Sequence, residues 1–157
     1  MLNINLNIHI MKKYFHLLLV GLFMVGFSAC KSGESISTNP ASLQGDWKIT
    51  AMNGNEIPSQ MRDVHTISFN TDGTVAGLAN CNRFAGTYSA QQEGGTVSMN
   101  NVSATKLDCE SKSNGYLDAL TSANSFQIKG ENQLVLSSSG GSGQLVFTKE
   151  MSGEEDS

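Results

Sequence analysis

From about residue 43 to residue 149, short runs of alternating apolar and polar residues follow one another, separated by Gly, Asn, Asp and Ser. Alternation with a period of two places every second side chain on the same face of a strand. In residues 65–69, His65, Ile67 and Phe69 share one face, and the Asn-Thr-Asp-Gly sequence that follows is a strong turn signal. The runs that predict strands are 47–52, 65–69, 74–78, 84–89, 96–99, 102–105, 126–129, 133–137 and 144–148.

One segment departs from this pattern. Between Ser113 and Asn124 the apolar residues recur at helical spacing, and Ser113 or Asn114 can cap the first turn. Those apolar residues are Tyr116, Leu117, Leu120 and Ala123. The sequence therefore predicts a mainly β fold, a small antiparallel β-barrel or sandwich with one packed α-helix. A barrel is favoured because closure leaves no exposed strand edge.

The first thirty residues are typical of a targeting segment. Met11 begins a signal-peptide pattern, with Lys12 and Lys13 as its positive region and an apolar region that runs to Phe27. The sequence Phe-Ser-Ala-Cys that ends at Cys30 resembles the bacterial lipobox. That resemblance implies cleavage after residue 29 and lipidation of Cys30. The alternative is an uncleaved anchor helix, and Met11 is a candidate for the true start because residues 1–10 carry no Lys or Arg.

Composition and charge fit one exported domain. The chain has 157 residues, of which 39% are hydrophobic and 15% charged, which excludes a disordered chain. Removing residues 1–29 leaves 128 residues (157 − 29), with 8 basic and 14 acidic side chains, a balance of −6. Such a chain is repelled by nucleic acid and by anionic lipid surfaces. We therefore expect membrane attachment through the lipid alone, and the order signal peptide (1–29), flexible tether (30–42), domain (43–149) and acidic tail (150–157).

Residues suited to catalysis or metal binding are few. Cys81 and Cys109 are an even pair in a compartment that permits disulfides, and three interpretations stay open: a structural disulfide, two buried thiols, or a reactive or metal-binding pair. His65 is the only histidine after residue 29, so a structural metal site would lack its fourth ligand. The sequence contains neither a nucleophile elbow nor a phosphate-binding loop. We therefore predict a protein that is not an enzyme and has no cofactor and no metal.

Several motifs in order along the chain resemble those of one known family. Leu-Gln-Gly-Asp-Trp at 43–47 is followed by Phe-Asn-Thr-Asp-Gly at 69–73. The most distinctive motifs are the Cys-Asn sequence at 81–82 with its neighbours, and the stretch from 105 to 109. The motif residues are Asn80, Cys81, Asn82, Arg83, Phe84, Gly86, Tyr88, Thr105 and Cys109. In this order they resemble the META domain family of bacterial envelope lipoproteins, the HslJ-like proteins. Asn80 stands where that family usually has Gly, and Leu107 where it usually has Met.

The resemblance implies a small barrel-like domain with one helix, an envelope lipoprotein, and a link to heat shock and novobiocin resistance. It implies no catalytic residues. We expect a monomer, anchored by its lipid in the outer membrane, that supports envelope integrity or stress tolerance through an envelope protein partner. The alternative is a barrel that binds a small molecule or inhibits a protease. An open apolar cavity lined by Trp47, Phe69, Tyr88 and Phe126 would support that alternative, and a filled interior would oppose it.

Overall fold

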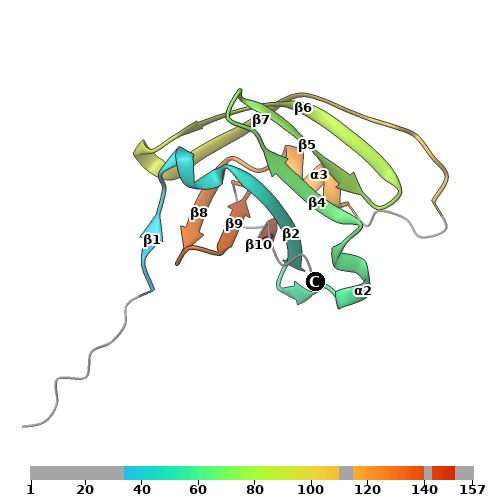
Figure 1. Ribbon diagram of the computed structural model, residues 1–157, viewed down its shortest axis with the longest axis horizontal. Coiled ribbons are helices and arrows are strands. Elements are labelled where there is room, and N and C mark those ends of the chain that lie inside the picture. Colours follow the sequence, from blue (N-terminus) through green and yellow to red (C-terminus); the bar gives the residue numbers. More distant parts are fainter. Residues whose placement is uncertain (1–33, 110–114, 140–142, 151–157) are drawn as a thin grey trace, which may run out of the picture. The chain divides into compact units, whose positions relative to one another are not determined.

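Eight antiparallel strands close on themselves in the computed structural model, which describes residues 34–109, 115–139 and 143–150 (Figure 1). The predicted signal peptide, Cys30 and the tail beyond Glu150 lie outside the described residues. The barrel strands are β2 (Gly45–Met52), β4 (His65–Phe69), β5 (Thr74–Ala79), β6 (Asn82–Gln91), β7 (Thr96–Ala104), β8 (Ser125–Lys129), β9 (Gln133–Ser137) and β10 (Gln144–Lys149). Their order around the barrel is β8-β7-β6-β5-β4-β2-β10-β9, with β9 pairing β8 again. The mainly β, barrel-like fold predicted from the sequence is confirmed.

The barrel is least tightly paired between β7 and β8. These strands share a single register pair, Thr96 with Ser125, whereas β6 and β7 are paired along most of their length. Helix α3 (Tyr116–Thr121) packs against β7 and β10, and the residue Asn124 that follows it accepts a hydrogen bond from the Val97 amide. The helix therefore supplies contacts to β7 where strand pairing with β8 is short.

Two predicted elements differ in detail. The runs 96–99 and 102–105 belong to one strand, β7, which is interrupted by the left-handed conformation of Asn101 (φ 53°) rather than by a turn. Helix α3 begins at Tyr116, after Gly115, and ends before Ala123, so it is shorter than the apolar spacing predicts. The predicted caps Ser113 and Asn114 lie outside the described residues.

The segment predicted to be a flexible tether contributes to the fold. Strand β1 (Ile36–Ser37) pairs antiparallel with β8, and the 3₁₀ helix η1 (Pro40–Leu43) leads into β2. Asn39 caps η1 by accepting a hydrogen bond from the Ala41 amide. Leu43 is fully buried. Residues 36–37 and 40–42 of the predicted tether therefore lie in regular structure. The sequence does not indicate this, because two-residue strand pairing leaves no periodic signal.

Other short elements were not predicted. A two-residue strand β3 (Asn55–Glu56) pairs β2, and the one-turn helix α2 (Ser59–Arg62) follows it. A second 3₁₀ turn, η2 (Glu93–Gly95), joins β6 to β7. Lys48 on β2 forms ion pairs with Asp63, just after α2, and with Glu150. Hydrogen bonds from the ammonium to both carboxylates raise the pKa of Lys48.

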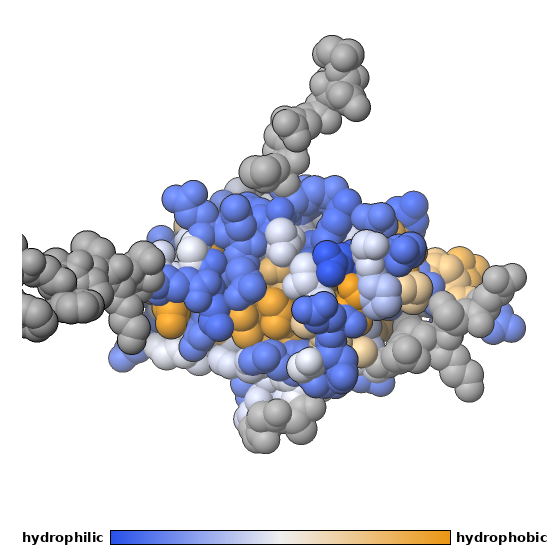
Figure 2. All heavy atoms as spheres, turned by 90° about the horizontal axis from the view of Figure 1, so that it is seen from below, coloured by the Kyte–Doolittle hydropathy of each residue, from blue (hydrophilic) through white to orange (hydrophobic). Residues whose placement is uncertain are grey.

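The interior of the barrel is filled by side chains. Its largest fully buried members include Trp47, Phe69, Phe126 and Phe147. The indole nitrogen of Trp47 donates a buried hydrogen bond of 2.7 Å to the Leu43 carbonyl, which satisfies its one polar atom. Seen from below, the surface is mostly hydrophilic, with small groups of hydrophobic residues between polar ones (Figure 2). None of the helices in the described part of the chain is long and apolar enough to cross a membrane.

Candidate functional site

The two most distinctive sequence motifs meet in the fold. Cys81, in the turn between β5 and β6, and Cys109, beyond the end of β7, form a disulfide with a Cα–Cα distance of 5.9 Å. That separation lies in the usual range for disulfides. Residues 81–83 and 105–109 together are called the clasp below. The clasp joins the end of one barrel hairpin to the segment that leads towards α3.

Asn82 is the centre of the clasp. Its side-chain oxygen accepts hydrogen bonds from the Thr105 hydroxyl (2.9 Å) and the Leu107 amide (2.7 Å), and its side-chain nitrogen donates to the Leu107 carbonyl (3.3 Å). The Thr105 hydroxyl in turn accepts from the Arg83 amide at 3.1 Å. Both motifs are therefore used to hold a segment without regular structure against β6. This is a structural role for the amide and the hydroxyl.

The turn before the clasp explains one departure from the family pattern. Asn80 has a φ of 61°, in the left-handed region where glycine is favoured. Asparagine is the side chain that tolerates this region best. The backbone N–H of Asn80 donates to the Val64 carbonyl at 2.7 Å. Asn80 therefore preserves the backbone conformation that a glycine at this position would supply.

Phe84 and Gly77 form a close cross-strand pair inside the barrel. A Cβ atom on Gly77 would lie 2.7 Å from the Phe84 ring and 2.1 Å from the Thr66 carbonyl oxygen. The hydroxyl of Tyr116, on α3, donates to the same carbonyl at 3.1 Å. Burial raises the pKa of this phenol. Position 77 therefore requires glycine, because the Phe84 ring and the Thr66 carbonyl occupy the space that a side chain would need.

Gly86 and Tyr88 shape the other half of β6. The register with β7 shifts between Ala85 and Thr87, and a Cβ on Gly86 would lie 2.8 Å from the Asn100 carbonyl. The Tyr88 hydroxyl donates to the Asn70 carbonyl at 3.1 Å, so it secures the β4–β5 turn. Partial burial, followed by the charge of Asp72, raises the pKa of Tyr88. These motif residues also have structural roles.

In the β4–β5 turn, Asp72 accepts hydrogen bonds from the hydroxyl (2.6 Å) and the amide (2.9 Å) of Thr74. These bonds, the hydroxyl first, lower the pKa of Asp72. Gly73 supplies the left-handed residue (φ 82°). The turn predicted by the sequence is therefore stabilised in the manner typical of Asx turns.

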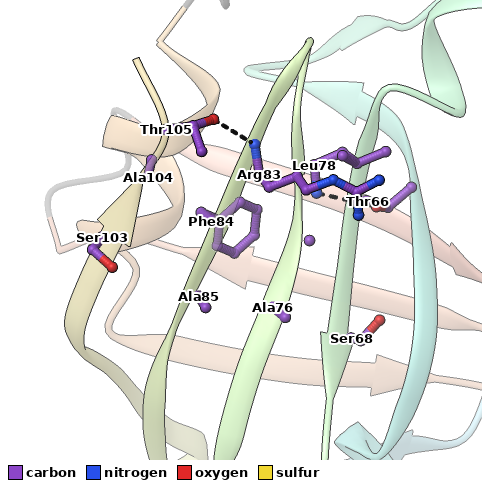
Figure 3. Close-up of a pocket in the computed structure, with 11 residues that line it drawn as sticks. Thr66, Ser68, Ala76, Leu78, Arg83, Phe84, Ala85, Ser103, Ala104 and Thr105 are labelled. Carbon is purple, nitrogen blue, oxygen red and sulfur yellow. Dashed lines mark hydrogen bonds between the residues drawn. The ribbon is translucent and has the colours of Figure 1, made fainter. Parts of the chain in front are cut away.

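A shallow groove runs across the outer face of β4 to β7 (Figure 3). Its floor is a row of small side chains in register, because Ser68 pairs with Ala76, Ala76 with Ala85, and Ala85 with Ser103. The residues that line the groove, with a volume of about 750 Å³, are Thr66, Ser68, Ala76, Gly77, Leu78, Arg83, Phe84, Ala85, Ser103, Ala104 and Thr105. Sequence reasoning did not identify this surface, because Ala, Ser and Thr on the outside of strands carry no functional signal.

Arg83 is the charged residue of the groove. Its side chain is exposed and extends from β6 across β5 towards Thr66 on β4 (Figure 3). Among the described residues, the ion pairs are those of Lys48, so Arg83 has no carboxylate partner there. One free guanidinium above small hydroxyl and methyl groups suits a carboxylate on an extended chain.

The four aromatic residues expected to face a ligand lie in the core or pack against it. Trp47 is fully buried, and Phe69 and Phe126 are 2% and 1% exposed. Tyr88 is partly buried, and its ring meets that of Phe69 edge-on at 4.9 Å. None of the four lines the groove on β4–β7 or the smaller cavity beside α2. The interior is thus packed rather than hollow, which is the arrangement that opposes an open binding barrel.

A second, smaller cavity of about 180 Å³ lies where β2, α2, β4 and α3 meet. It is lined by Ile49, Met52, Ile57, Pro58, Met61, His65 and Tyr116. In the sequence, His65 falls on a core-facing position of its strand, and the two methionines carry no signal of a role. The two methionines line the same cavity as His65 because of the position of α2, and a helix of four residues leaves no periodic pattern in the sequence.

Comparison with known proteins identifies the family. The family model of the META domain matches residues 41–152, which is well over half of the chain. The chain therefore belongs to the META domain family, as the motifs indicated. No curated protein sequence matches it.

Two solved structures share the fold. One is a DUF4847 family protein from Bacteroides vulgatus, with 19% identity and a TM-score of 0.53, over 71% of this chain and 96% of that one. The other is a protein from Burkholderia xenovorans solved by NMR, with 22% identity and a TM-score of 0.57, over 73% and 90% of the two chains. At these identities the likeness concerns the fold alone.

Proposed function

We propose that this META domain protein is a non-enzymatic lipoprotein of the bacterial cell envelope, and that it supports envelope integrity under stress by binding another protein. The lipobox-like sequence that ends at Cys30 supports the anchor. Membership of the META family supports the class of protein. The acyl chains hold the protein at the membrane, because the acidic domain has no charge attraction to lipid.

A non-enzymatic role is supported by the structural bonds that most of the polar motif side chains form. Asn82 and Thr105 are engaged in the clasp, Tyr88 secures a turn, and Cys81 is bonded to Cys109. A catalytic group must be able to reach a substrate in a defined protonation state. Among the motif residues, Arg83 is exposed, and its side-chain tip has no hydrogen bond or ion pair to any other residue that the structure describes. Its guanidinium is suited to binding rather than to acid–base chemistry, since it presents hydrogen-bond donors and no acceptor.

The groove on β4–β7 is the observation that carries the proposal. We assign to it an extended segment of an envelope protein, with a carboxylate that pairs with Arg83. The small floor side chains of Ala76 and Ala85 let such a segment approach closely, and the hydroxyl of Ser103 can bond to its backbone. The Ser68 hydroxyl donates to the Asp46 carboxylate and can accept a backbone N–H of the segment. The charge of the partner follows from the guanidinium, for which a bidentate carboxylate is the best match.

Anchoring is tested by replacing the acceptor cysteine. Wild-type protein should sediment with membranes and have an intact mass that begins at a lipidated Cys30. The variant Cys30→Ala should lack the lipid and remain uncleaved. A wild-type chain that keeps residues 1–29 or 11–29 would contradict the lipoprotein assignment.

Partner binding is tested by complementation of a deletion strain exposed to heat, detergent and novobiocin. Wild-type protein should restore survival, and Ala85→Arg, which fills the groove, should not. Gln127→Arg on β8 adds the same charge at an exposed position outside the groove and should restore survival fully. Arg83→Glu should fail and Arg83→Lys should retain part of the effect. Unchanged survival of the deletion strain would contradict the stress role, and full rescue by Ala85→Arg would contradict the groove.

A further inference from the structure

The second cavity brings together two methionines and a histidine from three separate elements. Met52 ends β2, Met61 lies in α2, and His65 begins β4. All three side chains are partly buried, so a small ion can reach the cavity from solvent although most of its wall is covered by protein. The remaining lining is apolar or aromatic, and it includes no Asp, Glu or Lys.

The histidine is held in one tautomer. Its Nδ1 lies 3.1 Å from the Met61 carbonyl oxygen, which can only accept, so Nδ1 carries the proton and donates it. In the neutral ring, Nε2 then bears a free lone pair. Within the described part of the chain no hydrogen bond reaches Nε2. A ring nitrogen prepared in this way, by donation from the other nitrogen to a carbonyl, is the usual arrangement of a metal-ligating histidine.

The orientation of the ring is fixed from a second side. His65 meets the ring of Tyr116 edge-on, with a centroid distance of 5.1 Å and an interplanar angle of 85°. Tyr116 is itself fixed by its bond to the Thr66 carbonyl. The imidazole therefore has little freedom to rotate away from the cavity, which reduces the entropy lost when a ligand binds.

Helix α2 is held in place by contacts that use neither methionine sulfur and neither ring nitrogen of His65. The Met61 amide donates to the Pro58 carbonyl at 2.9 Å, and the Arg62 side chain donates to the Ile57 carbonyl at 2.9 Å. The ion pair between Lys48 and Asp63 joins the end of α2 to β2. A four-residue helix would not be stable by itself. These contacts place Met61 opposite the strand residues in the absence of any ligand.

We propose that this cavity binds a soft monovalent metal ion, Cu(I), through the sulfurs of Met52 and Met61 and Nε2 of His65. Thioether and imidazole ligands without carboxylates select Cu(I) over Zn²⁺, Mg²⁺ and Ca²⁺. All three ligands are neutral, so the single positive charge of the ion is the only charge that enters the cavity. The apolar walls from Ile49 and Ile57 keep water from competing for the ion.

The competing explanation is packing alone. Methionine fills irregular spaces beside aromatic rings, and sulfur–aromatic contacts are favourable without a metal. Under that explanation, replacement of either methionine by leucine has no effect on metal binding. The two explanations are therefore separated by measuring metal binding and stability on the same variants.

The first measurement locates the ion. The full chain, with Cys30→Ser to remove its thiol, is labelled at the methionine methyl groups and titrated with Ag(I), a redox-inert analogue of Cu(I). The methyl resonances of Met52 and Met61 and the ring protons of His65 should shift together and saturate at one equivalent. Met99 on β7 and Met151 serve as internal controls and should not move. Shifts at Met151 alone, or no saturable shift, would overturn the proposal.

The second measurement gives the contribution of each ligand. Cu(I) is partitioned anaerobically between the protein and a chromophoric chelator, for the Cys30→Ser chain and for Met52→Leu, Met61→Leu and His65→Gln in that background. Each variant should lose at least about tenfold in affinity, because even residues that only orient a metal ligand contribute that much. Met99→Leu makes the same change at a partly buried site outside the cavity and should bind as the parent does.

Thermal unfolding of every variant shows whether it is folded. Leucine for methionine conserves volume, so the two methionine variants should unfold close to the parent temperature. If both bind Cu(I) with parental affinity while folded, the proposal fails, whatever His65→Gln does.

Discussion

The hydroxyl of Tyr116 on α3 donates a hydrogen bond to the carbonyl of Thr66 on β4, 50 residues earlier in the chain, with a distance of 3.1 Å. The Tyr116 ring is 1% exposed and meets the rings of His65, Phe84 and Phe147. A single side chain thus joins the helix to β4, β6 and β10. We infer that Tyr116 fixes the position of α3 on the barrel.

Replacement of Tyr116 by phenylalanine should therefore destabilise the protein without changing its fold. The ring contacts remain, but the Thr66 carbonyl loses one buried hydrogen bond, which costs about 0.5–1.5 kcal/mol. Urea unfolding at neutral pH measures this loss. Tyr88→Phe is the matched control, because its hydroxyl bonds to an exposed turn carbonyl, and a smaller loss is expected. Equal losses in the two variants would contradict the role of the buried bond.

The same residue predicts how stability responds to alkaline pH. Burial raises the pKa of Tyr116, so the folded state keeps its proton while the unfolded chain ionises above about pH 10. The unfolded state then binds fewer protons, and the free energy of unfolding falls as pH rises beyond that point. Unfolding measured between about pH 8 and pH 11 should show a shallower decline for Tyr116→Phe than for the wild type. Parallel curves would show that the phenol does not contribute.

Gly77 should be among the residues least tolerant of substitution. In Gly77→Ala the new methyl group would meet the Thr66 carbonyl oxygen at 2.1 Å and the Phe84 ring at 2.7 Å, and a carbonyl in a paired strand cannot move aside. We expect a loss of about 3 kcal/mol or more, at the upper end of overpacking effects. Gly54→Ala meets nothing within 4 Å and should lose only about 1–2 kcal/mol, from its φ of 78°. Denaturant unfolding of both variants makes the comparison, and similar losses would refute it.

The strands were predictable because alternation marks a half-buried strand wherever it is at least five residues long, as in 65–69 and 84–89. The pattern carries no information on which strands are neighbours at the closure, so the short β7–β8 pairing could not be foreseen. Elements of two to four residues, such as β1 and α2, have no periodicity at all. Their positions are decided by tertiary contacts, including the Lys48–Asp63 ion pair.

The site was predictable only in part. The sequence singled out Cys81, Asn82 and Thr105, but that they contact one another is a property of the fold. It also singled out Arg83, yet the groove beneath Arg83 is lined mainly by Ala, Ser and Thr, which are unremarkable in any strand. The sequence does not separate a ligand-facing Trp47 from a core Trp47, because aromatic side chains serve both cores and binding sites. Burial decides between these roles, and burial requires the structure.

The disulfide should contribute a large share of the stability of this small domain. In the chain-entropy model, a closed loop of 29 residues (109 − 81 + 1) contributes about 3–4 kcal/mol. Cys81→Ala/Cys109→Ala should lower the free energy of unfolding by about that amount. Thiol titration of denatured, unreduced Cys30→Ser protein from the envelope fraction should find no free thiol. Two free thiols would show that the pair is reduced in the cell, and an unchanged stability would contradict the contribution of the cross-link.

Asn82 should hold the segment after β7 in place independently of the disulfide. In Asn82→Ala the Leu107 amide and the Thr105 hydroxyl lose their acceptor, and these bonds are 2.7 and 2.9 Å long in the clasp. We expect a loss of about 1–3 kcal/mol. Hydrogen exchange gives the local test, because the Leu107 amide should exchange slowly in the wild type and much faster in the variant, while amides in β4 keep their protection. Asn100→Ala is the control, since its side-chain bonds of 3.4 and 3.5 Å to Ser98 are exposed and long, and it should leave Leu107 protected. Slow exchange at Leu107 in Asn82→Ala would mean that the cross-link alone positions this segment.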